Sequence, residues 1–254
     1  LANTVGASAG ADAFFVAFKI PNFLRRLFGE GAFAQAFVPV FTETRENEGD
    51  QSVKRLIDQV AGRLGLILVA ISILGILLAP WIAKLFAPGF SDDPAKLTLT
   101  ADLLRWTFPY LGFICFVAFA GGILNSIGRF AVPAATPVFL NLSLIGSALF
   151  LVPLMSPSVL GLAIGVAIAG VVQLIIQIPP LMTAGLLPKP SLLADHPGVS
   201  KILKLMVPAL FGVSVSQINL LLDTVLASLL ISGSVSWLYY SDRLMELPLG
   251  VIAI

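Results

Sequence analysis

Charged residues are scarce in this sequence. Only 11% of its 254 residues are Asp, Glu, Lys or Arg, whereas 57% are hydrophobic. The charged share is about half that of an ordinary soluble domain, and a water-soluble fold of this length cannot bury so much apolar surface. The net charge of +1 gives no indication of a nucleic-acid partner. The composition therefore predicts a membrane protein that does not bind nucleic acid.

Cysteine and histidine are almost absent. Cys115 lies in an apolar run and His196 lies in a polar stretch, so a disulfide framework and a Cys/His metal site are both excluded. The sequence also has no glycine-rich phosphate loop and no nucleophile beside a base. We therefore expect no enzyme activity and no cofactor. Energy would come from the substrate gradient, an ion gradient such as that of sodium, or the membrane potential.

Long apolar runs take up most of the chain. A run of about 20 apolar residues crosses the roughly 30 Å hydrocarbon core of a membrane as a helix. We therefore expect an all-α polytopic membrane protein. Because the sequence does not begin with Met and stops within an apolar run, we also expect a fragment of a longer protein. Seven apolar segments follow a short opening remnant, at residues 12–41, 64–87, 103–127, 130–155, 159–187, 202–231 and from 237 onward.

The first apolar segment, residues 12–41, carries Lys19, Arg25 and Arg26. Insertion of one Lys or Arg at a helix centre costs roughly 2.5 to 3.5 kcal/mol, so three would cost on the order of 8 to 10 kcal/mol if they faced lipid. Pro21 and the glycines after the arginines weaken the helix on both sides of the pair. Broken helices at membrane depth are tolerated where they line a cavity, and we expect these cations to line one.

A polar stripe is expected on this segment. In a continuous helix Asp12, Lys19, Arg26 and Glu30 share one face. The guanidinium groups of Arg25 and Arg26 suit phosphate oxygens, because they form paired, charge-assisted hydrogen bonds. The alternative is an internal ion pair between Arg26 and Glu30, or snorkelling of the long side chains toward the interface.

Further charges lie in the last two segments. Arg243 is spaced to pair with Glu246, next to Asp242, and either a structural pair near an outer aromatic belt or a ligand contact fits this spacing. Asp223 lies deep within residues 202–231. A carboxylate there must be neutral, paired or bound to a cation. A sodium ligand, a proton-coupling group and a hydrogen-bonded structural residue all remain open.

Glycines in the fifth segment have small-residue spacing. Gly161, Gly165 and Gly170 lie within residues 159–187. Small residues allow helix backbones to approach closely in a membrane. The spacing predicts tight packing of this segment against its neighbours.

The basic residues of the connections predict the topology, because cytoplasmic loops are enriched in Lys and Arg. Alternate connections hold eight basic residues against three in the opposite set. The first segment is thus expected to run from outside to inside, with Asp12 near the outer face. The larger set is Arg45, Lys54, Arg55, Arg63, Arg129, Lys189, Lys201 and Lys204, and the smaller set is Lys84, Lys96 and Arg105.

A weak internal repeat is present. Residues 8–21 can be laid on residues 232–245 with an offset of 224, which matches a small-residue turn, an aromatic cluster and Lys19 with Arg243. Chance, or the composition common to helix hairpins, would explain the match equally well. A true repeat would give two six-helix lobes related by an axis along the membrane normal.

Several stretches resemble the bacterial lipid II flippase family, MurJ (MviN), of the MOP exporter superfamily. They are ADAFFVAFKIPNFLRRLFGEGAFAQAFVPVF, APGF, GILNSIGRFAVPA, GVSVSQIN and SGSVSWLYYSDRLMELPLGV. The resemblance implies fourteen transmembrane helices in two lobes around a cationic cavity. On that frame residues 1–187 are the N-terminal lobe from the end of helix one to helix six, 188–201 a cytoplasmic loop, and 202–254 helix seven and the start of helix eight.

The resemblance also implies an activity and a location. The family moves lipid II, the undecaprenyl-pyrophosphate-linked peptidoglycan precursor, from the inner to the outer leaflet of the bacterial cytoplasmic membrane by alternating access. The implied partners are lipid II and membrane lipids, and we expect a monomer. An exporter of drugs or of another lipid-linked oligosaccharide is the alternative within the superfamily. A polyprenyl-phosphate enzyme, for which Asp92 and Asp93 would be the acidic pair, is a third hypothesis.

Carried over by motif, Asp12, Arg25 and Arg243 match residues that the family needs in its cavity. The neighbouring substrate-binding candidates are Lys19, Arg26, Glu30 and Glu246. Asp223 lies where some members have an Asp that contributes to a sodium site, so it is the ion-coupling candidate. The family's first-helix arginines and its helices nine to fourteen are absent from this sequence.

Overall fold

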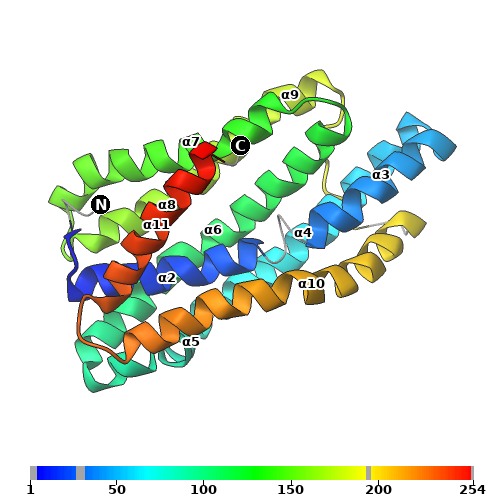
Figure 1. Cartoon of the computed structure of the whole chain (residues 1–254). Coiled ribbons are helices and arrows are strands. Elements are labelled where there is room, and N and C mark those ends of the chain that lie inside the picture. The colour runs from blue at the N-terminus through cyan, green and yellow to red at the C-terminus, as the bar shows by residue number, and fades with distance from the viewer. Residues whose placement is uncertain (1–4, 27–31, 193–195, 253–254) are drawn as a thin grey trace.

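The computed structural model describes residues 5–26, 32–192 and 196–252, and within these ranges the chain is helical, without strands. Figure 1 shows long helices running side by side, joined by short connections. The α-helices are α2 (Ala9–Arg25), α3 (Ala34–Glu48), α4 (Asp50–Leu77), α5 (Ala79–Phe86), α6 (Pro94–Ser126), α7 (Ala131–Gly146), α8 (Val159–Ile175), α9 (Ile178–Thr183), α10 (Pro197–Ser228) and α11 (Ser234–Ile252). Short 3-10 or π turns are η2 (Pro88–Asp92), η3 (Ser147–Leu151) and η4 (Val152–Leu154).

Five helical spans among the described residues are long and apolar enough to cross a membrane. The apolar side chains of α4 and α7 are widely exposed: Leu66 is 60% exposed and Ile145 56%. Such exposure would be unfavourable in water and suits contact with lipid tails. The expected all-α polytopic membrane protein is confirmed. The five spans are Asp50–Leu77, Pro94–Ser126, Ala131–Leu154, Val159–Thr183 and Pro197–Ser214.

Helix α6 forms the centre of the bundle. In the apolar stretch of α6 that could cross a membrane, 72% of the residues are buried. The share is 28% for α4 and 22% for α7 with the turns that follow it. Helices α2 and α8 pack against α6 (Figure 1). Phe14 and Phe15 of α2 and Tyr110 of α6 are fully buried in one core cluster. This packing fixes α2, the helix that carries the first cations.

The connection after the first segment is helical and not a loop, which corrects the expectation for residues 42–63. Helix α3 continues to Glu48 and α4 begins at Asp50. The chain turns at Gly49, whose φ of 81° is the left-handed conformation that glycine adopts without strain. The apolar run at residues 64–87 predicts only the later, apolar part of α4. The polar first turns of this helix pack into a second core cluster through Val53, Leu56 and Ile57.

The break expected before the arginine pair is not found, and the one expected after the pair falls outside the described residues. Helix α2 continues through Pro21 and ends at Arg25. Proline is accommodated here because the helix is buried on several sides by its neighbours. The glycines at 29 and 31, together with Glu30, lie outside the described residues.

The glycines of the fifth segment pack as predicted. A Cβ at Gly161 would lie 2.7 Å from the backbone nitrogen of Val152, and one at Gly170 would lie 2.9 Å from Cβ of Phe113. Gly165 similarly faces Ser147, whose Oγ would be 2.1 Å from an added Cβ. Helix α8 thus approaches α6 and the turns after α7 more closely than a larger residue would allow.

Candidate functional site

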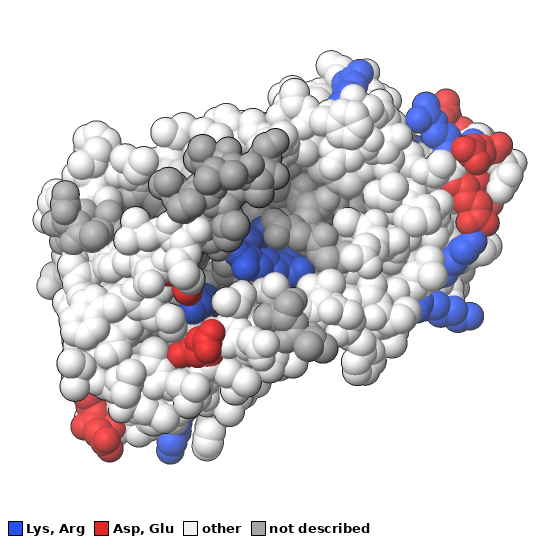
Figure 2. Space-filling view, viewed as in Figure 1, with Lys and Arg blue, Asp and Glu red and all other residues white. Residues whose placement is uncertain are grey.

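Two cavities adjoin the end of α2. The larger, of about 1270 Å³, lies among α2, α6, α7, α8 and α11. The smaller, of about 260 Å³, lies among α2, α10 and α11. Figure 2 shows basic side chains gathered in a hollow in the middle of one face, with acidic side chains close beside them. The residues that line both cavities are Phe18, Asn22, Arg26, Tyr239 and Arg243.

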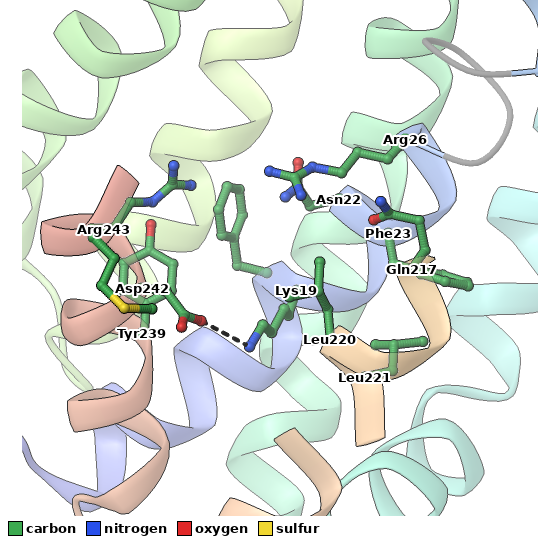
Figure 3. A pocket seen from close by; sticks show the side chains of 12 residues that line it. Lys19, Asn22, Phe23, Arg26, Gln217, Leu220, Leu221, Tyr239, Asp242 and Arg243 are labelled. Carbon is green, nitrogen blue, oxygen red and sulfur yellow. Dashed lines mark ion pairs between the residues drawn. The ribbon is translucent and has the colours of Figure 1, made fainter. Parts of the chain in front are cut away.

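Three arginines line the larger cavity. Arg25 and Arg26 lie at the end of α2, and Arg243 comes from α11. The Nε of Arg25 donates a hydrogen bond to Oδ1 of Asn22 at 2.9 Å, and the guanidinium carbon of Arg243 lies 5.4 Å from the centre of the Tyr239 ring. Arg26 and Arg243 lie on opposite sides of the smaller cavity in Figure 3. Planar guanidinium groups held in this way suit an anion with several oxygens.

Lys19 joins the arginines in the smaller cavity. Its Nζ lies 3.8 Å from Oδ2 of Asp242, and both side chains are partly buried (Figure 3). The other charges that act on the Lys19 ammonium are those of Asp223, Arg26 and Arg243. The sequence-predicted cations of α2 and α11 are therefore brought together across one cavity, and a carboxylate of α11 offsets part of their charge.

The predicted polar stripe is wrong for Asp12, because Asp12 does not share a cavity with Lys19 and Arg26. Asp12 is 1% exposed and does not line either cavity. Its Oδ2 accepts hydrogen bonds from Lys96 Nζ at 2.9 Å and Gly233 N at 2.7 Å. Its Oδ1 accepts from Ser236 N at 2.9 Å and Ser236 Oγ at 2.6 Å. The carboxylate ties α2 to the start of α6 and α11, and a substrate-binding role of Asp12 stays a prediction.

Contacts between α2 and α11 join positions of the predicted repeat. Asp12 and Ser236, which hydrogen-bond, are 224 residues apart. Phe15 and Tyr239 have the same separation, and their rings stack with centroids 4.1 Å apart. Corresponding residues meet in this way where a two-fold axis passes between two copies of an element. These contacts favour a true repeat over chance.

The roles of all candidate residues stay predictions, those of Glu30, Glu246 and Asp223 among them. Glu30 lies outside the described residues, and the side chain of Glu246 does too, so the alternative pairing of Arg26 with Glu30 stays open. Asp223 is exposed on α10 and not buried as the sequence suggested. Among the described residues no three His, Cys, Asp or Glu side chains gather as metal ligands. A sodium-binding role of Asp223 therefore stays a prediction.

Sequence reasoning missed the partner of Asp12 and the neutral side of the larger cavity. Lys96 was assigned to an outer connection, yet it is only 8% exposed and pairs with Asp12. Gln173 and Gln177 line the cavity from α8 and the turn after it. The sequence feature that could have indicated this neutral side is the pair Gln173 and Gln177, four residues apart near the end of a long apolar run.

The fold and the cavity define a polytopic helical membrane protein whose cations face a central cavity. A model of the family described as lipid II flippase MurJ matches residues 1–254. The chain belongs to this family. Its family and its membrane-length helices place it in the bacterial cytoplasmic membrane, as the sequence predicts.

Individual relatives agree with the family model. A protein of Haemophilus influenzae named "probable lipid II flippase MurJ" is 51% identical over 100% of this chain and 51% of its own length. One of Vibrio cholerae with the same name is 51% identical, with 50% of its length covered. A Burkholderia cenocepacia protein named "lipid II flippase MurJ" is 41% identical, again with 50% covered. The chain thus spans about half the length of the curated relatives it matches.

A solved structure has the same fold. The structure titled "Lipid II flippase MurJ, inward closed conformation" superposes with a TM-score of 0.83 at 30% sequence identity. The match covers 99% of this chain and 51% of that chain. The arrangement of helices around the cavity is therefore that of a MurJ structure over the part that the two share.

Proposed function

We propose that this chain is part of a flippase that moves lipid II across the cytoplasmic membrane, and that it is not an enzyme. The observation that carries the proposal is the meeting of Arg25, Arg26 and Arg243 on one cavity within an apolar bundle. Cations at this depth are costly unless an anion or water faces them, and the diphosphate of a lipid-linked precursor supplies such an anion. The names of the relatives support this choice of substrate over a drug.

The mechanism that fits is alternating access. A ligand moves an equilibrium between two states only if it contacts them differently. Arg25 and Arg26 lie on α2 and its end, whereas Arg243 lies on α11, so a shared anion would draw the two helices together. We propose that residues 1–187 and 202–254 belong to different lobes, joined by 188–201, and that rocking of the lobes exposes the cavity to each side in turn.

An ion gradient or the membrane potential would drive the cycle. Sodium or the membrane potential would act on a charge whose environment changes between the states. Asp223 fits this role because it is exposed on α10, and its charge acts on Lys19 in the smaller cavity. A sodium-dependent transport rate that is lost in Asp223→Asn would support this coupling. An unchanged dependence would remove Asp223 from it.

Arg25→Ala tests the proposed function. The variant is made in a protein of full family length that contains this chain, and translocation of lipid II is measured in vesicles. Loss of charge-assisted hydrogen bonds of about 1.5 to 3 kcal/mol should lower the rate roughly 10- to 100-fold. Arg25→Lys should retain part of the rate because it keeps the charge.

Arg105→Ala is the matched control. Arg105 is exposed and pairs with Asp102 on its own helix, outside both cavities. Its loss should leave transport unchanged. Full transport by Arg25→Ala would exclude the assigned role.

A further inference from the structure

The larger cavity is also lined by two glutamines in fixed orientations. Gln173 and Gln177 are 2% and 1% exposed. Nε2 of Gln173 donates to the backbone oxygen of Thr136 at 2.8 Å, and Nε2 of Gln177 donates to that of Val117 at 3.1 Å. A backbone oxygen accepts only from the nitrogen end of an amide. These bonds therefore determine where each side-chain oxygen points.

The oxygen ends of both amides lack a partner. Oε1 of Gln173 and Oε1 of Gln177 are buried and accept no hydrogen bond from any residue that the structure describes. Buried polar atoms in proteins are nearly always hydrogen-bonded, and an unpaired acceptor is costly. Both residues line the larger cavity. A donor that enters this cavity would satisfy the two oxygens.

The surroundings of the two oxygens are neutral and narrow. The residues that α6 and α7 contribute to the cavity include Asn125 and Asn141, and none of those contributed is charged. A Cβ added at Gly121 would lie 3.9 Å from Oε1 of Gln177 and 3.5 Å from Cβ of Pro133. A side chain at position 121 would therefore stand beside Oε1 of Gln177 and the ring of Pro133. Acceptors in such a setting suit uncharged donors.

We propose that Gln173 and Gln177 form a neutral subsite that accepts hydrogen bonds from hydroxyl or amide N–H groups of the transported headgroup. Asn141 belongs to the same side of the cavity and is exposed to it. The inference rests on the proposed function, because the arginines of α2 and α11 would hold the diphosphate of the same ligand. The cavity would thus bind two chemical features of one ligand: the anion at the arginines, and a glycan or peptide portion with uncharged donors at the glutamines.

The test compares two lipids that share the anion. Binding of undecaprenyl pyrophosphate and of the same lipid carrying its glycan and peptide is measured on a purified protein of full family length. Gln173→Met and Gln177→Met remove the acceptor at nearly constant size, together with the amide donor to the backbone, whose loss affects both lipids alike. Each should weaken binding of the glycan-bearing lipid about fivefold, the equivalent of one ordinary hydrogen bond, and leave that of the bare pyrophosphate lipid within about twofold.

Control variants separate the subsite from general damage. Gln217→Met makes the same change in the smaller cavity, on α10, and should leave the ratio of the two affinities unchanged. If the buried variants fail to fold, Asn141→Leu tests the same side of the cavity with an exposed residue, and the same selective loss is expected.

The outcomes distinguish the two proposals. Unchanged binding of both lipids by the glutamine and Asn141 variants would overturn the subsite, as would an equal loss for both lipids, which indicates a structural role or a site filled by water. Arg25→Ala should weaken both lipids together. If it weakens neither, the proposed function fails, whatever the glutamine variants show.

Discussion

At the residue scale, Asp12 shows how one buried charge is made tolerable. Its carboxylate accepts four hydrogen bonds, two of them from the backbone at the start of α11 and one from Lys96. A buried charge is stable only when it is paired and its lone pairs are satisfied. The first turn of a helix also offers free N–H groups and a favourable dipole for an anion. Asp12 therefore serves to position α2, α6 and α11.

Lys96→Met should destabilise the protein strongly. It leaves the carboxylate of Asp12 buried without its cation, and removal of one partner of a buried pair costs about 3 to 5 kcal/mol. Unfolding in detergent micelles, followed by circular dichroism, measures the change. Addition of Asp12→Asn should recover part of the loss because the charge is then gone.

Arg105→Met provides the comparison for Lys96→Met, since the pair of Arg105 with Asp102 is about half exposed. Exposed pairs contribute only about 0 to 1 kcal/mol. Equal effects of Lys96→Met and Arg105→Met would show that the Asp12 network does not stabilise the fold.

The cations of the cavity could be predicted from the sequence, but the Asp12 network could not. Lys19, Arg25 and Arg26 are costly in an apolar segment wherever it folds, so an energetic argument is enough to expect a cavity. The partners of Asp12, in contrast, include backbone groups more than 220 residues away. Backbone donors leave no mark in a sequence, and only the tertiary structure brings them to the carboxylate.

At the element scale, apolar length locates the helices but not their ends. The run predicted at residues 64–87 becomes the later part of α4 and all of α5. The first turns of α4, from Asp50 on, precede this run. They are held by contacts in the second core cluster. Glycine spacing was the more reliable guide to packing, because close approach of backbones excludes a side chain whatever the register of the ends.

Gly161→Ala should destabilise the contact between α8 and the turns after α7. The added Cβ would lie 2.7 Å from the backbone nitrogen of Val152, which cannot rotate away. Overpacking of this kind typically costs about 1 to 3 kcal/mol. The melting temperature in micelles should fall accordingly.

Gly146→Ala is the matched change in α7, where an added Cβ meets no heavy atom within 4 Å. Alanine favours a helix over glycine by about 1 kcal/mol, so this variant should melt at the same temperature or higher. A lower melting temperature for Gly146→Ala than for Gly161→Ala would contradict the packing argument.

At the scale of the whole molecule, contacts near two ends of the bundle hold α10 and α11 against the other helices. At one end the Asp12 network holds the start of α11. At the other, Lys201 of α10 pairs with Glu43 of α3, and His196 contacts Oγ of Ser52 at 3.0 Å. Figure 1 shows α3 and the start of α10 together, far from the start of α11. The cavities lie between these two sets of contacts.

The outline of this arrangement follows from simple patterns in the sequence. The Lys and Arg count of the connections predicts the orientation, and the offset of 224 fits a repeat, which the contacts of α2 with α11 then favour over chance. The closure at each end was not predictable, since Lys201 counted only as a basic residue of a connection and no pattern singled out Glu43. Their pairing depends on the start of α10 packing along α3, which neither segment's composition specifies.

Locking the end at Glu43 and Lys201 should stop transport. In an alternating-access cycle the ends open in turn, so a bond that prevents one opening halts the cycle. Glu43→Cys with Lys201→Cys is joined by a cleavable bifunctional reagent, in a protein of full family length whose other accessible cysteines have been replaced. Lipid II translocation should fall to background and return on cleavage.

Asp102→Cys with Arg105→Cys is the control pair, because both positions are exposed, lie one turn apart on α6 and form an ion pair within that helix. A cross-link there joins no separate elements, so transport should continue after the same treatment. Transport that persists with α3 and α10 joined would mean that this end stays closed throughout the cycle. The substrate would then have to enter between other helices. The comparison of the two pairs therefore tests whether the contact of α3 with α10 opens during transport or is a permanent part of the fold.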